Sequence, residues 1–207
     1  MHLLELCDFA SQGLAKGGLV YLASLDIDGA FDTVPHALLV RKLEKEGVDR
    51  YVVRYVATRL MERSFRVRLH TPAGKFYSSK RSISREVPQG GVLSPLLWLI
   101  HFNKVHERLA ALRAAEEEIF GGIGCMDLIY ADDVATLLVH SDARRLVRAA
   151  KRNAELVAAV LRELGLNLSV PKSVNLVISP GLCGGSVFRR VPNSFRGSNL
   201  QRAETDQ

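Results

Sequence analysis

The sequence predicts an α+β fold of the split βαβ type, in which helices pack on one face of a small antiparallel sheet. Apolar runs rich in β-forming residues occur at Gly18–Ile27, Leu128–Leu138 and Lys172–Ser179. Stretches with apolar residues at helical spacing lie between these runs. The chain has 207 residues and a hydrophobic content of 47%, which is enough to bury one sizeable core. We therefore expect one main domain.

The N-terminal half is expected to form a strand, two helices and a hairpin. After the strand Gly18–Ile27, Pro35 fits the first turn of a helix that ends at Gly47. The stretch Asp49–Ser64 has apolar residues at helical spacing and predicts a second helix. The segments "FRVRLH" and "GKFYSSKRSI" then alternate like the arms of a hairpin around Thr71–Gly74. The polar side of this hairpin is basic.

The C-terminal half is expected to form two helices and three strands. One long helix is predicted from Leu93 to about Glu118, and two short strands then flank an Ala-Asp-Asp tip. An amphipathic helix follows at Ser141–Gly165, whose first residue, a serine, fits the N-cap position. The strand Lys172–Ser179 completes a folded domain over residues 1–180. Little periodicity remains in Gly181–Gln207, which we expect to be a disordered tail.

The composition favours a polyanionic partner and a location inside the cell. The net charge is +6 and the sequence pI is about 9.4, which suits nucleic acid. Basic residues crowd into Arg41–Arg85, although such a run is also typical of a plain solvated face. Three widely spaced cysteines suggest neither a disulfide framework nor a zinc site. Since no apolar stretch approaches a membrane span and no signal peptide is apparent, we expect an intracellular protein, in cytoplasm and nucleus, that is not secreted.

Two acidic turns are the first candidates for a functional site. The run "LIYADDVATLL" sets Asp132 and Asp133 among apolar residues, and Asp26 ends an earlier strand. A hairpin tip alone would explain the aspartate pair, because Asp is a common turn residue. Neighbouring strands would, however, bring these carboxylates together, and hard oxygen ligands select Mg²⁺ or Mn²⁺, two of which can activate phosphoryl transfer. Asp28 and Asp32 are expected to support these ligands or to cap a helix.

A third candidate element stands between the two acidic turns. In "VPQGGVLSPLL", Pro88, Gly90 and Gly91 would let backbone approach a ligand closely, and the following helix N-terminus favours anions. The segment suggests a wall of a substrate site, although a Pro-Gly turn before a helix would look the same.

These segments together resemble a known family. "LDIDGAFDTV", "VPQGGVLSPLL", "YADD" and "GLNLSVPKS" occur in the order and approximate spacing of the palm motifs of reverse transcriptases, and they are most similar to those of non-LTR retrotransposons. The resemblance covers about Leu19–Ser179. It implies a polymerase palm with an RRM-like sheet, partial fingers, and RNA-templated DNA synthesis by two-metal nucleotidyl transfer.

The resemblance also implies roles for individual residues. Asp26 and Asp132 would be the ligands of two Mg²⁺ ions, with Mn²⁺ as an alternative, and Asp133 a supporting acid. Lys172 would protonate the pyrophosphate leaving group. Phe31 would act as a steric gate against the 2′-hydroxyl, although core packing would also explain it. The remaining substrate-binding positions that match are Gln89, Gly90 and Tyr130.

The implied partners are an RNA template, a DNA primer and deoxynucleoside triphosphates, with no membrane. Only about 25 residues precede Asp26, where the family carries basic finger motifs, and Gly181–Gln207 shows no primer-grip hairpin or thumb. We therefore expect a fragment whose finger and thumb segments belong to a longer polyprotein.

Three other interpretations remain. An RNA-templated RNA polymerase would usually carry a small polar or acidic residue in place of Phe31 and glycine in place of Ala131. A group II intron maturase has overlapping motifs. A non-enzymatic remnant would bind nucleic acid only through the basic face of Arg41–Arg85.

Overall fold

The computed structural model describes residues 2–180 and 186–191, and the chain divides into two compact units. The first, here called the sheet unit, comprises the chain up to Asp28, Lys104–Glu163 and the chain from Asn167 onward. The second, the helix–hairpin unit, comprises Gly29–Asn103 and Leu164–Leu166. Among the described helices, none has both the length and the apolar character needed to cross a membrane.

The sheet unit is built on a five-stranded antiparallel sheet of strand order β6-β7-β1-β8-β9. β1 lies at its centre and is the most buried strand, since apolar residues cover both of its faces. This explains why its sequence reads as a nearly continuous apolar run. The strands are β1 (Leu19–Ile27), β6 (Gly124–Tyr130), β7 (Asp133–His140), β8 (Leu168–Pro180) and β9 (Ser186–Val191).

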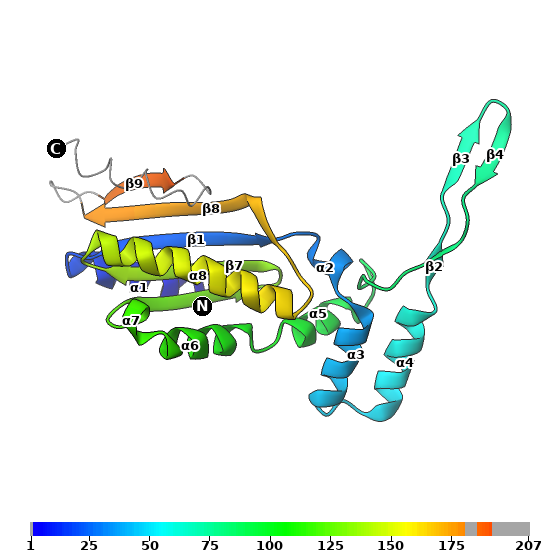
Figure 1. Ribbon diagram of the computed structural model, residues 1–207, viewed down its shortest axis with the longest axis horizontal. Helices are drawn as coiled ribbons and strands as arrows, with labels where there is room; N and C mark the ends of the chain where they lie inside the picture. Colours follow the sequence, from blue (N-terminus) through cyan, green and yellow to red (C-terminus); the bar gives the residue numbers. More distant parts are fainter. Residues whose placement is uncertain (1, 181–185, 192–207) are drawn as a thin grey trace. The chain divides into compact units, whose positions relative to one another are not determined.

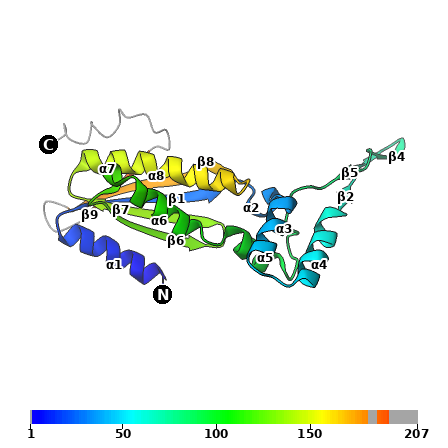
Figure 2. The same ribbon diagram turned by 60° about the horizontal axis from the view of Figure 1, so that its bottom comes forward.

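Helices lie on both faces of this sheet (Figure 2). On one face, Thr136 of β7 takes part in a hydrogen-bond network with side chains of α6 (Val105–Ala115) and α8 (Ala143–Glu163). Val139 of β7 points to the opposite face, because successive strand residues alternate. There it packs so closely on Gly13 of α1 (His2–Ala15) that a Cβ on Gly13 would lie 2.5 Å from its Cγ1. The predicted α+β fold is thus confirmed, and α1 is an unexpected helix on the second face.

The helix–hairpin unit contains the expected helices and hairpin. Its core is formed by apolar side chains of α3, α4 and α5, with Trp98, Leu39 and Leu43 almost fully buried. Two short two-stranded ladders, β2 with β5 and β3 with β4, form the hairpin arm. The elements are α2 (Ala30–Thr33), α3 (His36–Lys45), α4 (Arg50–Met61), β2 (Ser64–Phe65), β3 (Arg68–Thr71), β4 (Gly74–Tyr77), β5 (Arg81–Ser82) and α5 (Ser94–Phe102).

The long helix expected from Leu93 to Glu118 is wrong: three helices occupy this span. α5 ends at Phe102, and after Lys104, whose φ is 66°, α6 begins; α7 (Glu117–Phe120) follows it. Carbonyl groups at a helix end need hydrogen-bond donors. The ammonium group of Lys42 supplies them, because it donates to the carbonyl oxygens of His101 at 2.8 Å and Asn103 at 2.9 Å. A side chain some 60 residues earlier in the chain therefore satisfies the end of α5.

Two further expectations near the C-terminus need correction. Asp142, and not Ser141, caps α8: its carboxylate accepts the backbone N–H groups of Arg144 at 2.7 Å and Arg145 at 3.1 Å. These hydrogen bonds, that of Arg145 foremost, lower the pKa of Asp142. Of the expected tail Gly181–Gln207, residues 186–191 form β9, which pairs with β8. The rest of that segment lies outside the described residues.

Candidate active site

The end of β1 and the turn between β6 and β7 meet at one edge of the sheet. The ladder between β1 and β7 runs to the pair Leu25–Val134, so Asp26 stands beside the start of β7. The hairpin between β6 and β7 closes with a two-residue turn, Ala131 and Asp132. This edge therefore carries all three predicted metal ligands: Asp26, Asp132 and Asp133.

The turn has a constrained backbone. Ala131 has a φ of 52°, in the left-handed region that a non-glycine residue rarely adopts. A positive φ at the first of two loop residues is typical of a type II′ hairpin turn. Asp132 is half-buried, Asp133 is exposed, and Tyr130 is 76% exposed at the end of β6. The aspartate pair thus does mark a turn, as the simplest reading of the sequence predicted, and the turn presents Asp132 at the sheet edge.

A bulge in β8 brings Lys172 to Asp26. Between Ser24 and Asp26 of β1 there is one residue, whereas their partners Val174 and Ser169 on β8 are separated by four. Extra residues of this kind bend a strand and redirect its side chains. The hydroxyl of Ser173 holds the bulge, since it donates to the carbonyl of Ser169 at 2.8 Å and accepts the N–H of Asp26 at 3.2 Å. The ammonium nitrogen of Lys172 consequently lies 3.7 Å from Oδ2 of Asp26.

The Oδ2 atom of Asp26 is a buried acceptor at this edge of the sheet. It is buried and accepts no hydrogen bond from the described residues, and the nearby Lys172 side chain is 68% exposed. A buried carboxylate oxygen without a donor is costly unless a cation neutralises it. The atom is therefore available to a metal ion.

The donor set suits Mg²⁺ or Mn²⁺. Within residues 2–180 and 186–191, no three His, Cys, Asp or Glu side chains are grouped closely enough to enclose an ion. Mg²⁺ does not need such a cage, because it is commonly held by one or two carboxylates together with substrate phosphates. Asp26 and Asp132 fit that description.

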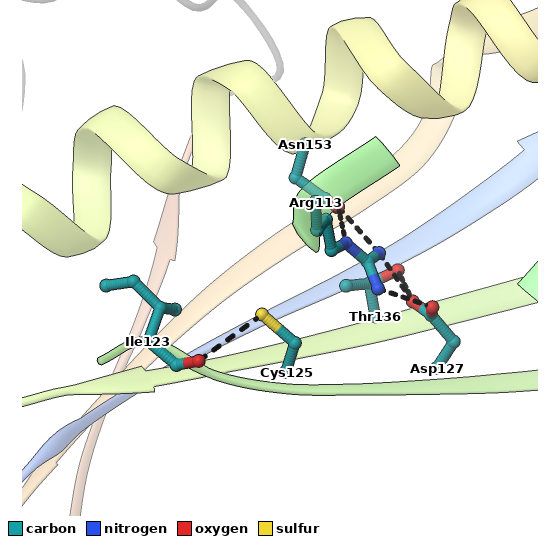
Figure 3. Close-up of polar contacts among 6 residues, drawn as sticks. All are labelled: Arg113, Ile123, Cys125, Asp127, Thr136 and Asn153. Carbon is teal, nitrogen blue, oxygen red and sulfur yellow. Dashed lines mark hydrogen bonds and ion pairs between the residues drawn. The ribbon is translucent and has the colours of Figure 1, made fainter. Parts of the chain in front are cut away.

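A buried polar network anchors the hairpin that bears this turn (Figure 3). Arg113 of α6 forms a bidentate ion pair with Asp127 of β6, at 2.6 and 2.8 Å, and both side chains are at least 93% buried. The guanidinium group also donates to Oδ1 of Asn153 on α8, and the hydroxyl of Thr136 donates to Asp127 at 2.7 Å. A one-residue slip of the hairpin would turn Asp127 to the other face of the sheet. The network therefore fixes the register between β6 and β7, and this register determines which residues form the turn at the tip of the hairpin.

The predicted gate residue lies in the other unit. Phe31, the second residue of α2, is half-buried, and its ring stacks on that of Trp98 with centroids 5.1 Å apart. Trp98 in turn stacks on Phe102 at 5.2 Å. Phe31 is thus held by the aromatic core of the helix–hairpin unit while part of its surface stays accessible.

Gln89 is oriented by an aspartate. Its side-chain nitrogen donates to Oδ1 of Asp32 at 3.0 Å, so Asp32 positions the glutamine and does not cap a helix. Gly90 has a φ of +76°, which favours glycine. A Cβ on Gly91 would lie 2.6 Å from Oγ of Ser94, and this hydroxyl donates to the carbonyl of Pro88. The segment before α5 is therefore a tight turn built around two glycines.

The predicted site residues fall into two groups. Asp26, Asp132, Asp133 and Lys172 gather at one edge of the sheet unit, and Tyr130 adjoins them. Phe31, Gln89 and Gly90 belong to the helix–hairpin unit. Arg113 and Asp127 were missed in the sequence, although a carboxylate inside an apolar strand and an arginine on the apolar side of a helix were both signals of a buried pair.

Comparison with known sequences identifies the family to which the chain is similar. Residues 5–196 match the model of the family described as reverse transcriptase (RNA-dependent DNA polymerase). A retrovirus-related Pol polyprotein from the type-1 retrotransposable element R2 of Popillia japonica is 32% identical over 189 residues, 90% of this chain and 24% of that protein. An RNA-directed DNA polymerase from the mobile element jockey of Drosophila melanogaster is 30% identical over 137 residues, 66% of this chain and 14% of that protein. The chain thus spans about a quarter or less of these relatives.

Solved structures share the fold. Apo telomerase from Candida tropicalis, truncated from its C-terminal domain, superposes with a TM-score of 0.57 at 14% identity, over 90% of this chain and 39% of that one. Telomerase from Candida albicans, solved with a fragment of telomeric RNA, superposes with a TM-score of 0.53 at 16% identity. The match covers 82% of this chain and 30% of that one. Since the family model spans nearly the whole chain and the fold agrees, this protein belongs to the reverse transcriptase (RNA-dependent DNA polymerase) family.

Proposed function

We propose that the chain carries the polymerising centre of a non-LTR retrotransposon reverse transcriptase, which extends a DNA primer on an RNA template. The observation that supports this most is the unsatisfied Oδ2 of Asp26 beside the turn that holds Asp132. The reaction joins the primer 3′-oxygen to the α-phosphorus of a deoxynucleoside triphosphate. The bond from that phosphorus to pyrophosphate breaks.

In this proposal Asp26 and Asp132 hold two Mg²⁺ ions, or Mn²⁺ in their place, and Asp133 adds negative charge beside them. When bound, the ions supply positive charge for the attacking and leaving oxygens. Lys172 donates a proton to the departing pyrophosphate, a role that suits an exposed ammonium group beside Asp26.

The remaining residues select and position the nucleotide. The ring of Phe31 fills the space that a 2′-hydroxyl would need, and its stack on Trp98 keeps the ring in place. The amide of Gln89, oriented by Asp32, contacts the nucleotide and the template strand. Backbone at Gly90 approaches the substrate closely, and the exposed ring of Tyr130 borders it.

The proposed substrates are those of the family: RNA template, DNA primer and deoxynucleoside triphosphates. Because the chain spans about a quarter of the R2 polyprotein, further finger and thumb segments of a longer polyprotein would complete the grip on them. An intracellular site of action, in the cytoplasm and nucleus, goes with these substrates.

Two assays with the 207-residue chain test the proposal. Mn²⁺ binding, followed by electron paramagnetic resonance, reports the metal site without requiring turnover. Primer extension on an RNA template with four deoxynucleotides reports the reaction. Asp26→Asn and Asp132→Asn should each weaken Mn²⁺ binding and lower extension by at least about a hundredfold, since charge stabilisation by the metal contributes several kcal/mol.

Glu118→Gln is the matched control, because it also replaces a carboxylate by an amide in the sheet unit, at a side chain that is 85% exposed. It should leave both readouts unchanged. Mn²⁺ binding and extension that survive in the Asp132→Asn protein would refute the assignment.

A further inference from the structure

The positive charge of the protein is concentrated in the helix–hairpin unit. That unit holds thirteen lysines and arginines against six aspartates and glutamates, an excess of seven, whereas the whole chain has a net charge of +6. The sheet unit therefore contributes none of the surplus. A partner attracted by charge would be drawn to the helix–hairpin unit.

Within this unit, the hairpin arm Ser64–Ser82 carries cations without any acid. The arm contains five lysines and arginines and no aspartate or glutamate, and it extends beyond the helices of its own unit (Figure 1). All five side chains are exposed, and none takes part in an ion pair with the described part of the chain. They are Arg66, Arg68, Lys75, Lys80 and Arg81. Their charges are thus free to meet an external anion.

The register of the β3–β4 hairpin separates two faces. Arg68 pairs with Tyr77 and His70 pairs with Lys75, and because strand residues two apart share a face, these four side chains lie together. The pair Leu69–Phe76 lies on the opposite face. Arg68 and Lys75 are diagonal neighbours on the first face, so their like charges repel, and an anion bound between them removes this cost.

We propose that the face formed by Arg68, His70, Lys75 and Tyr77 binds an unpaired nucleic-acid strand. The cations contact phosphates, and the ring of Tyr77, which is 56% exposed, stacks on a base. A polyanion with flat bases matches both features of the face, whereas an acidic protein surface would use only the charge. Identifying this strand as the RNA template rests on the proposed function, but the binding itself does not.

Fluorescence anisotropy with the 207-residue chain and a labelled, unstructured 20-nucleotide RNA tests the proposal, in EDTA and between 50 and 200 mM salt. The double variant Arg68→Gln/Lys75→Gln should bind more weakly, and the slope of log affinity against log salt should fall by about 1.4, since each phosphate contact on a single strand contributes about 0.7. Tyr77→Val, which keeps a β-forming residue, should lose about 5- to 150-fold in affinity, the range for one stacked base.

Two matched controls isolate the face. Arg41→Gln/Arg54→Gln removes the same charge from exposed positions of α3 and α4 and should leave the salt slope nearly unchanged. Leu69→Thr alters the opposite face of the hairpin and should bind normally. The proposal would be overturned if the two double variants lost RNA affinity and salt slope equally. It would also be overturned if Tyr77→Val and Leu69→Thr lost equal RNA affinity. Tighter binding of an RNA–DNA duplex with no effect of Tyr77→Val would overturn it as well.

The same assay separates this inference from the proposed function. Asp26→Asn and Asp132→Asn should bind the RNA normally, because no divalent ion is present in EDTA. Loss of RNA binding at the hairpin face with intact Mn²⁺ binding would contradict this inference alone. Loss of Mn²⁺ binding with intact RNA binding would contradict the proposed function alone.

Discussion

The ammonium nitrogen of Lys172 lies 3.7 Å from Oδ2 of Asp26, the carboxylate oxygen that accepts no hydrogen bond from the described residues. The pair is loose, because an ion pair with an exposed lysine contributes about 0 to 1 kcal/mol. Lys172 could therefore leave Asp26 at little cost to make room for the proposed metal ion. The β8 bulge keeps its backbone nearby in either case.

Lys172→Ala should separate metal binding from chemistry. We expect Mn²⁺ binding to be unchanged or stronger, because a competing cation is removed from Asp26. Extension should fall by about 10²- to 10⁴-fold if Lys172 acts as the general acid. Electron paramagnetic resonance and single-nucleotide incorporation measure the two effects. Lys16→Ala, an exposed lysine of the same unit, should alter neither, and weaker Mn²⁺ binding by Lys172→Ala would contradict the assignment.

Arg113→Met should strongly destabilise the sheet unit. Removing one partner of a buried ion pair leaves Asp127 uncompensated, which costs about 3 to 5 kcal/mol in free energy of unfolding. Urea unfolding measures this loss. The exposed pair between Arg148 and Glu118 provides the control, and Arg148→Met should cost less than about 1 kcal/mol. Similar costs at the two sites would show that the network of Figure 3 does not anchor the hairpin.

Much of the fold could be predicted because local pattern and tertiary role agree. The apolar run of β1, the stripe of α8 and the alternation of β3 and β4 each indicate the element that forms. That Asp26 and Asp132 lie at the same edge of the sheet follows from the pairing of neighbouring strands alone. These features depend on short-range periodicity, which a single sequence displays.

The features that were missed depend on contacts between distant residues. The end of α5 is satisfied by Lys42, and no glycine or proline marks the break. Asp32 accepts a hydrogen bond from Gln89, 57 residues later, so its orienting role has no local signal. α1 docks on the sheet through the close approach of Gly13 to Val139, and the spacing of apolar residues in the sequence does not predict this contact.

The environment of His101 also depends on a distant residue, Leu164, and it leads to a prediction. His36 and His101 are both almost fully buried, although histidine is on average only moderately buried in proteins. Nε2 of His101 lies 3.0 Å from the carbonyl oxygen of Leu164, so this nitrogen carries the hydrogen, and Nδ1 has no partner among the described residues. Burial lowers the pKa of His101 to about 4; the Leu164 carbonyl opposes this shift and the Lys42 ammonium adds to it.

The stability of the protein should therefore fall below about pH 6.5. Between pH 6.5 and 4 the unfolded chain binds a proton at this histidine and the folded chain does not, so the free energy of unfolding declines as pH falls. From the shifted pKa, the loss is about 3 kcal/mol by pH 4. Unfolding by urea at a series of pH values measures it. His101→Gln should flatten this part of the profile, whereas the exposed His106→Gln should not, and identical profiles would contradict the prediction.

The stack of Phe31 on Trp98 determines how the proposed gate should be tested. Phe31→Ala would remove packing as well as the gate, so Phe31→Val, which leaves part of the side chain in contact, is the sharper variant. It should raise the incorporation of ribonucleotides relative to deoxynucleotides, because the ring that would collide with a 2′-hydroxyl is gone. Competitive incorporation with both nucleotides in one reaction measures the ratio. Leu97→Ala, a buried substitution in the same unit, should lower stability without moving the ratio. An unchanged ratio in an active Phe31→Val protein would mean that Phe31 serves only the aromatic core.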